Sequence, residues 1–472
     1  MLKNHILYNV NMCSPIFNNC KLNILDKLID DNKDLAEQGS DEWLSIRKYT
    51  IGGSEMSTIT GDNPYSKLDS LVSQKIGFTK FDGNIACRWG KVFEVITTQL
   101  TERIMNINKI HETGSLEGAT NGQRYSPDGL AVVKVKCHDV INNKEIETDE
   151  YCIVLFEFKS PYSSIPTGII PKHYLPQVLT GLCSIPITDF AIFINNVYRK
   201  CSISDLNETL DYDINFHSRD AKLEPTEVLA LGVNIFYQTN AQKNKFIEMY
   251  KKDDIVVNSD ASISDSDDSD DSDNTENIFN NIKGKQQFEK KTYNDIPELY
   301  RYIQNIHFEN QAPESVRDVR DFGTSNYFEF NDLLKLYDDD LISLHVSKPH
   351  ICENYYENEY LKAQELKPDI IDNLETSIEN YKKEIKEFPN IIGYLPFKLF
   401  KSDIIVQERD PEYINKHKEK INDTINILND INDSETEFEK IKKFKNYFPK
   451  SKILKNTGRE IHDAFKFMPM GM

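Results

Sequence analysis

One short segment constrains the fold of this chain more than any other, namely Tyr151–Lys159, with the sequence YCIVLFEFK. Its length and its run of apolar residues predict a buried strand. Positions two apart in a strand share a face, so Glu157 and Lys159 point one way while Phe156 and Phe158 pack the other way. A lysine on a central strand is unfavourable unless it is paired or takes part in chemistry. The segment therefore predicts a buried strand that carries a functional Glu–Lys pair.

The preceding segment Leu130–Cys137 (LAVVKVKC) predicts a partner strand, joined to Tyr151–Lys159 by a polar stretch that contains Asn142-Asn143. Asp128, in the sequence Ser-Pro-Asp-Gly, stands at the turn into this strand, where it can approach Glu157. Two close carboxylates repel each other unless a cation lies between them, and hard oxygen ligands suit Mg²⁺ or Mn²⁺. Lys159 can orient a metal-bound water, while the metal stabilises charge that develops on a phosphodiester.

Two further polar residues lie on expected helices. Glu94 belongs to an amphipathic helix at 89–107, on which apolar residues recur at helical spacing, and Gln177 belongs to a helix at 171–185 opened by Pro171. Each signal has an ordinary alternative, because an Asp-Gly is commonly a turn, a Glu-x-Lys a solvated pair and a lone Glu a surface residue. The joint occurrence of the SPDGL turn and a nearly all-apolar strand with Glu157 and Lys159 on one face favours a functional site. Gln177 is placed to hydrogen-bond Lys159 or the water and so fix their geometry.

Composition supports a globular protein: 39% of the 472 residues are hydrophobic and 11% are aromatic. The beginning of the sequence has no charged segment followed by an apolar run, and no stretch reaches about eighteen apolar residues, so we expect neither a signal peptide nor a membrane span. The eight cysteines form no CxxC pattern. This indicates reduced thiols in a cytoplasm-like compartment and no zinc or iron–sulfur cage. No histidine spacing or GxxxxGK[ST] motif predicts a zinc site or nucleotide hydrolysis.

The formal net charge of −20 is unevenly distributed. Residues 253–276 hold nine Asp, one Glu and no Lys or Arg, and their composition predicts a disordered segment that serves as a linker, a phosphorylation target or a nucleic-acid mimic. The run 440–459 holds seven Lys, one Arg and no acid. Its lysines alternate with aromatics, which suits backbone contacts with nucleic acid, although a solvated helix face is an equal alternative. The candidate contacts there are Lys442, Lys443, Lys445 and Tyr447.

Seven short motifs in a fixed order resemble the YqaJ-type viral recombinase and bacteriophage lambda exonuclease family, within the PD-(D/E)XK nucleases. They are Trp43-x3-Arg47, Ile51-Gly52-Gly53-Ser54-Glu55, Gly61-Asp62-Asn63-Pro64-Tyr65, Arg88-Trp89-Gly90-Lys91-x2-Glu94, SPDGL, FEFKSP and Pro176-Gln177. The resemblance covers roughly 41–200. It implies a restriction-endonuclease-like α/β core with a central mixed β-sheet flanked by helices, and a ring-shaped trimer.

The resemblance also implies roles for individual residues. Glu94, Asp128, Glu157 and the Phe158 carbonyl would hold two Mg²⁺ ions, with Mn²⁺ as an alternative; Lys159 would be catalytic and Gln177 would support it. Arg47 and Ser54 would bind a 5′-phosphate, and Trp43 would stack on a terminal base. From the residues themselves, Gly52-Gly53-Ser54 predicts a turn opening a helix, and such a helix start beside an arginine suits phosphate. Ser54 as a simple N-cap, Arg47 as a surface ion pair and Trp43 as a core residue remain alternatives.

The sequence departs from the family's compact pattern in two ways. Asp128 and Glu157 are 29 positions apart, which predicts an extended hairpin tip. The closing strand and helix of the family match 391–430 better than anything between 200 and 250. We therefore predict an N-terminal extension at 1–40, a nuclease core at 41–214, a large helical and disordered insertion at 215–388, closing core elements at 389–435 and a basic tail at 436–472.

The main hypothesis is a Mg²⁺-dependent exonuclease that digests linear double-stranded DNA, 5′ to 3′, for recombination, repair or genome processing in a large DNA virus. Its partners would be DNA ends and a single-strand annealing protein, with no membrane, in the cytoplasm or at a viral replication site. One alternative is a nuclease of the same fold acting on RNA or structured junctions. Another is an interaction protein that uses the acidic insertion to bind a host or viral partner.

Overall fold

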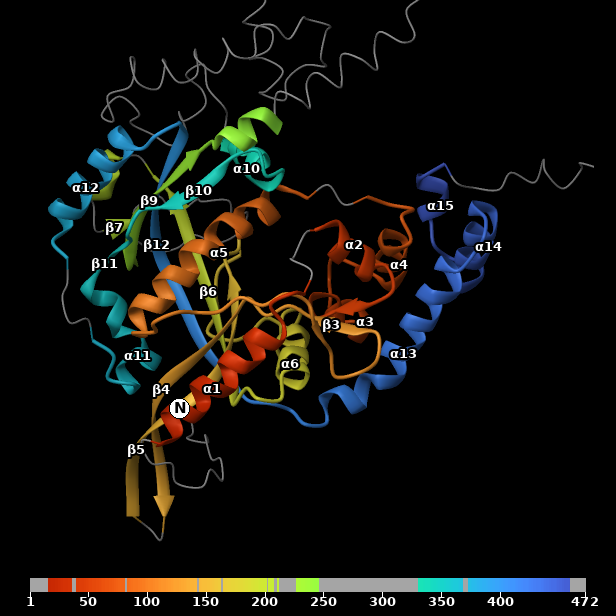
Figure 1. Ribbon diagram of the computed structural model, residues 1–472, viewed down its shortest axis with the longest axis horizontal. Coiled ribbons are helices and arrows are strands. Elements are labelled where there is room, and N and C mark those ends of the chain that lie inside the picture. The colour runs from red at the N-terminus through yellow and green to blue at the C-terminus, as the bar shows by residue number, and fades with distance from the viewer. Residues whose placement is uncertain are drawn as a thin grey trace, which may run out of the picture.

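The protein is described from a computed structural model (Figure 1). It describes residues 16–35, 40–80, 83–141, 144–162, 164–201, 203–207, 210–211, 226–245, 330–367 and 372–458. The expected disordered run at 253–276 lies outside these ranges.

A mixed sheet forms the centre of the molecule, with the strand order β10-β9-β12-β6-β5-β4 and β11 paired to β9. β5 and β6 are parallel, and the other neighbouring pairs of this sheet are antiparallel. The strands are β4 (Gly129–Ile141), β5 (Lys144–Lys159), β6 (Phe190–Lys200), β9 (Ala230–Tyr237), β10 (Ser343–Val346), β11 (His350–Ile351) and β12 (Ile391–Gln407). The prediction of an α/β core with a central mixed sheet flanked by helices is confirmed.

The buried strand predicted at Tyr151–Lys159 is the second half of a longer strand. β4 and β5 form an antiparallel ladder that runs to the pair Ile141↔Lys144, so the described residues of the polar stretch, 138–141 and 144–150, continue the two strands (Figure 1). The extra length of this hairpin accounts for the separation of Asp128 and Glu157 in sequence. Both residues lie at its base, where the ladder joins the central sheet.

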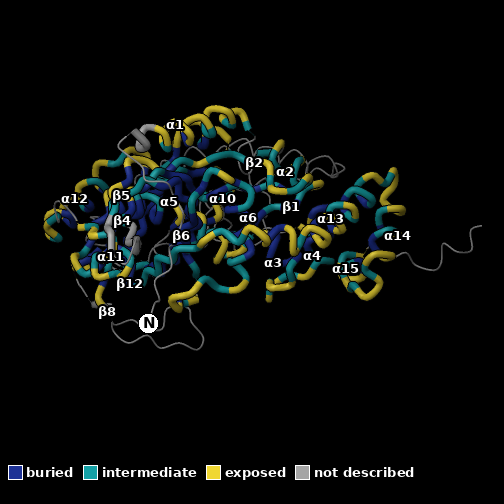
Figure 2. The backbone as a smooth tube through the Cα atoms, turned by 90° about the horizontal axis from the view of Figure 1, so that it is seen from below, coloured by how far each residue is buried: buried dark blue, intermediate teal, exposed yellow. Residues whose placement is uncertain are grey.

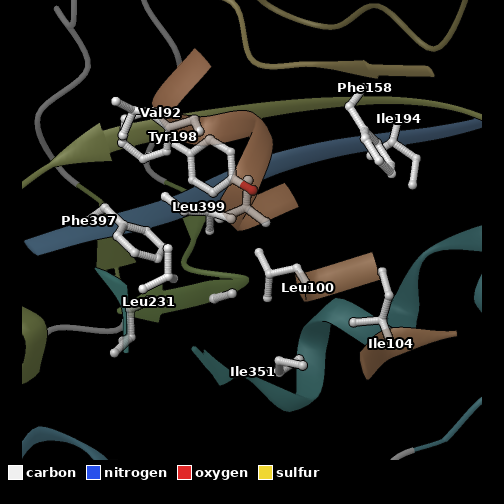
Figure 3. Packing of buried hydrophobic residues seen from close by; sticks show 14 of the residues in the cluster. Val92, Leu100, Ile104, Phe158, Ile194, Tyr198, Leu231, Ile351, Phe397 and Leu399 are labelled. Atoms are coloured by element: carbon white, nitrogen blue, oxygen red, sulfur yellow. The ribbon is translucent and has the colours of Figure 1, made fainter. Parts of the chain in front are cut away.

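Helices cover both faces of the sheet, following the alternation of side chains along β5. One face carries Val154, Phe156 and Phe158 and packs against α5 (Ile85–Ile104), whose buried residues include Val92, Phe93 and Ile96 (Figure 3). The other face carries Ile153 and Leu155 and packs against α6 (Leu175–Ser184) and α1 (Ile16–Asp31). Glu157 and Lys159 share the second face.

The N-terminal extension contributes to this second face, although its sequence shows no clear periodicity. In α1, Leu25 is 1% exposed and lies in the same hydrophobic cluster as Ile153 and Leu155. Lys21 Nζ lies 2.6 Å from the Asp189 carboxylate, which also accepts the Ile153 N–H at 2.7 Å. The helix is therefore joined to the beginning of β6 by packing and by an ion pair.

A second, mostly helical group lies beside the sheet and joins segments from both ends of the chain (Figure 1). Its core combines Ile51, Met56 and Val72 with Ile421, Leu428 and Phe444. The elements are α2 (Asp41–Arg47), η1 (Gly53–Glu55), α3 (Met56–Thr60), α4 (Leu68–Lys75), α13 (Tyr413–Asn432), α14 (Glu437–Tyr447), α15 (Ile453–Asn456), and the small sheet of β1 (Ile51–Gly52), β3 (Gln123–Tyr125) and β2 (Leu116–Glu117).

The region predicted as an insertion does not stand apart from the sheet. β9, β10 and β11 fall within 215–388, and β9 pairs with both β10 and β12. The described part of this region also contains α10 (Phe330–Asp338), η4 (Glu353–Glu357), α11 (Glu359–Ala363), α12 (Leu374–Glu387) and β8 (Thr226–Glu227), which pairs with β7 (Leu210–Asp211) beyond η2 (Ser204–Asn207). The described part of this region contains more helix than strand, as expected, but a buried apolar run at 230–237 forms a strand of the central sheet.

The predicted return of the chain to the core after residue 388 corresponds to β12, which pairs with β6 over ten registered positions from Phe397↔Lys200 to Gln407↔Ala191. The strand expected at 391–409 and the helix expected from Pro411 are confirmed as β12 and α13. The division into domains stays a prediction. Residues 437–447 and 453–456 of the predicted tail are helical. Among the described residues, none of the helices combines the length and apolarity needed to cross a bilayer.

Candidate active site

Asp128 is fixed against β5 by a backbone contact. Its Oδ2 accepts the N–H of Phe158 at 2.8 Å, which joins the turn before β4 to the strand that carries Glu157 and Lys159. Gly129 leaves room for the Ile110 side chain, because a Cβ at position 129 would lie 2.2 Å from Ile110 Cγ2. The Ser-Pro-Asp-Gly motif is therefore required for its shape as well as for its carboxylate.

Lys159 lies between the two acidic side chains of the site. Its Nζ forms an ion pair with Glu157 Oε1 and lies 3.5 Å from Asp128 Oδ2. It also lies 5.5 Å from the centre of the Tyr174 ring, within the range of a cation–π contact. Burial opposes the charged form, but the Asp128 and Glu157 carboxylates hold the pKa of Lys159 well above its ordinary value. The lysine is a fixed positive charge in this arrangement.

The acidic residues of the site repel one another. Glu157 is fully buried. Its burial, and to a smaller extent the nearby Asp128 charge, raises its pKa to about 7. Glu94, on α5, remains accessible to solvent, yet partial desolvation and the Asp128 charge raise its pKa to about 8. Because Glu94 also senses Lys159 and Glu157, the four predicted charged residues form one electrostatic group.

Tyr125 belongs to this site and was not predicted. Its side chain is 1% exposed, and its hydroxyl donates to Glu157 Oε2 at 2.9 Å. Burial and the Glu157 charge raise the pKa of the Tyr125 hydroxyl well above its ordinary value, so it acts as a donor. Its sequence signal was only its place directly before the Ser-Pro-Asp-Gly motif.

Two predicted assignments are not brought into direct contact with the group. Gln177 lies half-buried in the first turn of α6, and within the described residues we find no side-chain hydrogen bond from it to Lys159. Phe158 approaches Asp128 through its N–H, whereas the predicted metal ligand is its carbonyl. Both roles stay predictions.

The donor set suits a hard divalent cation in its chemistry. Asp128 and Glu157 offer carboxylate oxygens that already share one cation, the Lys159 ammonium, and Glu94 adds a third carboxylate at the edge of the group. In the described part of the chain no three such side chains are gathered closely around one point. A bound metal would thus require the Lys159 ammonium to yield its place between the carboxylates.

Arg47 and Trp43 lie one turn apart on α2 and form a stacked pair. The Arg47 guanidinium carbon lies 4.4 Å from the centre of the Trp43 ring, and the Arg47 Nη2 lies 2.6 Å from Glu55 Oε1. Ser54, one residue before Glu55, is exposed. Ser54 is the second residue of a short helical segment, which has three residues of η1 followed by five of α3, so a helix dipole adds little there. The structure therefore assembles Arg47, Trp43 and Ser54 around one exposed loop.

Lys75 lies beneath this loop and was not predicted. Its Nζ contacts Glu55 Oε2 at 2.8 Å, the Arg47 carbonyl at 2.9 Å and the Thr50 carbonyl at 2.8 Å. Burial opposes ionisation of Glu55, but Lys75 and Arg47 outweigh it and lower its pKa, while burial also lowers the pKa of Lys75. Two cations, Lys75 and Arg47, and the Gly52 N–H surround the Glu55 carboxylate, and this surrounding favours its charged form.

The predicted contacts on α14 divide into two pairs. Lys443 Nζ lies 3.0 Å from Asp430 Oδ1, and the Tyr447 hydroxyl donates to Asp430 Oδ2 at 2.8 Å. Lys442 and Lys445 are exposed, whereas Ile441 and Phe444 of this helix are buried. Figure 2 shows exposed stretches along α13 and α14. At the end of α13, Asn432 donates to the Lys48 carbonyl at 2.9 Å, so α14 begins close to the Arg47 loop.

Comparison with known proteins agrees with the motifs. Residues 42–189 match the YqaJ-like viral recombinase domain. Arg47, Ser54, Glu94, Asp128, Glu157, Lys159 and Gln177 all fall within the matched residues, whereas α13 and α14 lie outside them.

Two similar curated proteins are counterparts of one another from two isolates of African swine fever virus. They are 28% and 29% identical over 202 residues, which is 40% of this chain and 59% of each relative. Among solved structures, the alkaline exonuclease LHK-Exo from Laribacter hongkongensis is 18% identical and covers 34% of this chain and 74% of its own. Its TM-score is 0.25, and its complex with dAMP gives the same value.

Proposed function

We propose that this chain is a Mg²⁺-dependent exonuclease that digests linear double-stranded DNA from its 5′ ends. The observation that carries the proposal is the group at the base of the β4–β5 hairpin, where Lys159 lies between Asp128 and Glu157 with Glu94 across from them. A lysine beside paired carboxylates on a buried strand has no evident structural use, and it suits phosphodiester hydrolysis. The YqaJ-like domain, which contains all four of these residues, supports a viral recombination nuclease.

In this proposal Asp128, Glu157 and Glu94 would hold the metal, whose chemistry would be activation of a water and stabilisation of charge on the phosphate. Lys159 orients the attacking water and adds a positive charge beside the scissile phosphate. Phe156, Phe158 and α5 close the opposite face of the sheet, so the reacting side chains keep a fixed geometry (Figure 3).

The exposed loop around Arg47 and Ser54 would bind the terminal 5′-phosphate. Arg47, Lys75 and Glu55 together leave one net positive charge there, which suits an anion. Lys75 is buried and would not contact the phosphate itself. It neutralises Glu55 and so leaves the Arg47 charge available. Trp43 supports the guanidinium from behind by stacking.

Lys442 and Lys445 would contact the backbone of the incoming duplex. Both lysines are exposed, in a stretch from 440 to 459 that has no acidic residue, and their helix begins beside the Arg47 loop. Lys443 and Tyr447 would instead hold the helix through Asp430.

A digestion assay tests the catalytic proposal. Linear duplex with 5′-phosphates, nicked circular DNA and single-stranded RNA are each incubated with Mg²⁺ and the wild-type, Lys159→Ala or Glu157→Ala protein. We expect wild type to digest the linear duplex, and each variant to lose at least about 100-fold in kcat. Lys134→Ala is the matched control, because Lys134 lies on β4 in an exposed ion pair with Asp149. Intact linear duplex with wild type, or full activity in both variants, contradicts the proposal, whereas RNA digestion alone favours the RNA alternative.

Two further variants test the contacts with DNA. Arg47→Ala should lose the preference for 5′-phosphate over 5′-hydroxyl ends. Lys48→Ala is the control, because Lys48 is an exposed cation next to Arg47 in sequence, and this variant should keep the preference. Equal loss on both kinds of end contradicts the phosphate assignment. The double variant Lys442→Ala/Lys445→Ala should reduce the slope of log Kd against log salt by about 1 to 2. An unchanged slope contradicts the α14 assignment.

A further inference from the structure

Tyr125 occupies the junction between the exposed loop and the catalytic carboxylates. It is the last residue of β3, and β3 pairs in parallel with β1, which leads directly into Gly53 and Ser54. Its hydroxyl donates to Glu157 Oε2 at 2.9 Å. Tyr125 is therefore connected to the loop through the backbone of β3 and to the site through its side-chain hydroxyl.

Two glycines hold the Tyr125 ring in place. A Cβ at Gly53 would lie 2.4 Å from Tyr125 Cδ2, and a Cβ at Gly181 in α6 would lie 2.4 Å from Tyr125 Cζ. At the neighbouring Gly52, the nearest atom to such a Cβ would be 3.6 Å away. The ring thus fills the space that side chains at Gly53 and Gly181 would take. Because buried contacts of this kind leave no free volume, a shift of the loop at Gly53 must move the ring or strain it.

We propose that Tyr125 is a positioning residue that couples occupancy of the Arg47–Ser54 loop to the orientation of Glu157. This inference rests on the proposed function. When a terminal phosphate fixes the loop, the Tyr125 ring is held, and its hydroxyl fixes Glu157 Oε2 so that Oε1 faces the cation position now taken by Lys159. The coupling is reciprocal, so a metal held by Glu157 strengthens binding of the phosphorylated end by the same factor. DNA lacking a 5′-phosphate would then be bound but cleaved slowly.

Metal binding without DNA tests the positioning role separately from activity. Titration calorimetry with Mn²⁺ should show about 10-fold weaker binding for Tyr125→Phe than for wild type, the usual consequence of removing a partner of a metal ligand. Tyr355→Phe is the matched control, because that tyrosine is also 1% exposed and its hydroxyl bonds Ser402 away from this site. Tyr125→Phe keeps the ring and its packing, and thermal melting confirms that it folds. Unchanged Mn²⁺ affinity in a folded Tyr125→Phe protein overturns the positioning role.

Kinetics on two substrates test the coupling. For wild type, a 5′-phosphate should raise kcat and lower KM relative to a 5′-hydroxyl end. In Tyr125→Phe the KM ratio should persist while the kcat ratio falls towards unity, and Gly53→Ala should act similarly. A kcat ratio that survives in Tyr125→Phe overturns the coupling. If wild type digests no DNA, the proposed function fails, and the Mn²⁺ titration still decides whether Tyr125 positions Glu157.

Discussion

Lys75→Met should destabilise the protein strongly although it removes no apolar surface. The ammonium group is nearly buried, and it contacts the Glu55 carboxylate and the carbonyls of Arg47 and Thr50. Methionine is close to lysine in length, so the substitution changes the volume of the buried side chain little. What is lost is one positive charge and three hydrogen bonds, and Glu55 is left with Arg47 as its remaining cation.

The magnitude follows from the burial of both partners. The exposed fractions of the Lys75 and Glu55 side chains are 5% and 10%, so solvent screens the pair weakly. Removing one partner of a buried ion pair costs about 3–5 kcal/mol, mainly because the other charge stays buried and uncompensated. Arg47 still pairs with Glu55, which places the expected loss near the lower end of that range. In the double variant Lys75→Met/Glu55→Gln, the uncompensated charge is gone, so the two effects should fall short of additivity by about 1–3 kcal/mol.

Urea denaturation measures these free energies of unfolding, with Lys67→Met as the control, because Lys67 is the exposed residue that precedes the same helix. The pH dependence has a defined sign. Since the folded pKa of Glu55 lies below 4.5, its ion pairs stabilise the protein above that pH, and their contribution disappears as the pH falls through the lowered pKa. The deficit of Lys75→Met should therefore shrink in acid. A loss below about 1 kcal/mol with additive effects would refute the reasoning.

Three further results are expected. Because burial and mutual repulsion raise the pKa of Glu157 to about 7 and that of Glu94 to about 8, the metal-free protein should lose thermal stability as the pH rises from 4.5 through these values, and Mg²⁺ should reduce the loss; melting curves in EDTA that are flat with pH would contradict this. Lys159→Met should abolish cleavage but bind Mn²⁺ at least as tightly as wild type in titration calorimetry, because a cation that competes for the carboxylates is gone; weaker binding would show that Lys159 builds the metal site. Leu25→Ala should lower the free energy of unfolding by about 2–5 kcal/mol, because that side chain is 1% exposed against the sheet, and a loss under about 1 kcal/mol in urea denaturation would mean that α1 packs loosely.

The sequence predicted that Asp128, Glu157 and Lys159 lie together, because strand alternation is a strong physical constraint. Once Tyr151–Lys159 is a buried strand, Glu157 and Lys159 must share a face, and the Ser-Pro-Asp-Gly turn must deliver Asp128 to the same end of the hairpin. The structure adds the Phe158 N–H that fixes Asp128 and the ion pair that joins Lys159 to Glu157. Local periodicity was sufficient for these residues because they lie on two adjacent strands.

The residues missed by the sequence reasoning depend on contacts between distant segments. Tyr125 acquires its role only when β3 meets Gly53, Gly181 and Glu157, and Lys75 only when the end of α4 lies beneath Glu55. The position of β9 was missed for a related reason. Its apolar alternation indicates a strand, but nothing in its local sequence shows that it pairs with β12, which lies more than 150 residues later in the chain.

Charge balance offers a physical account of how such an acidic site can exist in the folded protein. Glu157 is fully buried next to Asp128, and an isolated buried carboxylate pair would be strongly unfavourable. Lys159 and the Tyr125 hydroxyl occupy the two oxygens of Glu157, so the chain neutralises the group with its own side chains. The same arrangement in the Arg47 loop places Lys75 beneath Glu55. In both places a lysine compensates a carboxylate, but Lys75 also contacts two backbone carbonyls, whereas Lys159 contacts the carboxylates that the proposed function would require it to share with a metal ion.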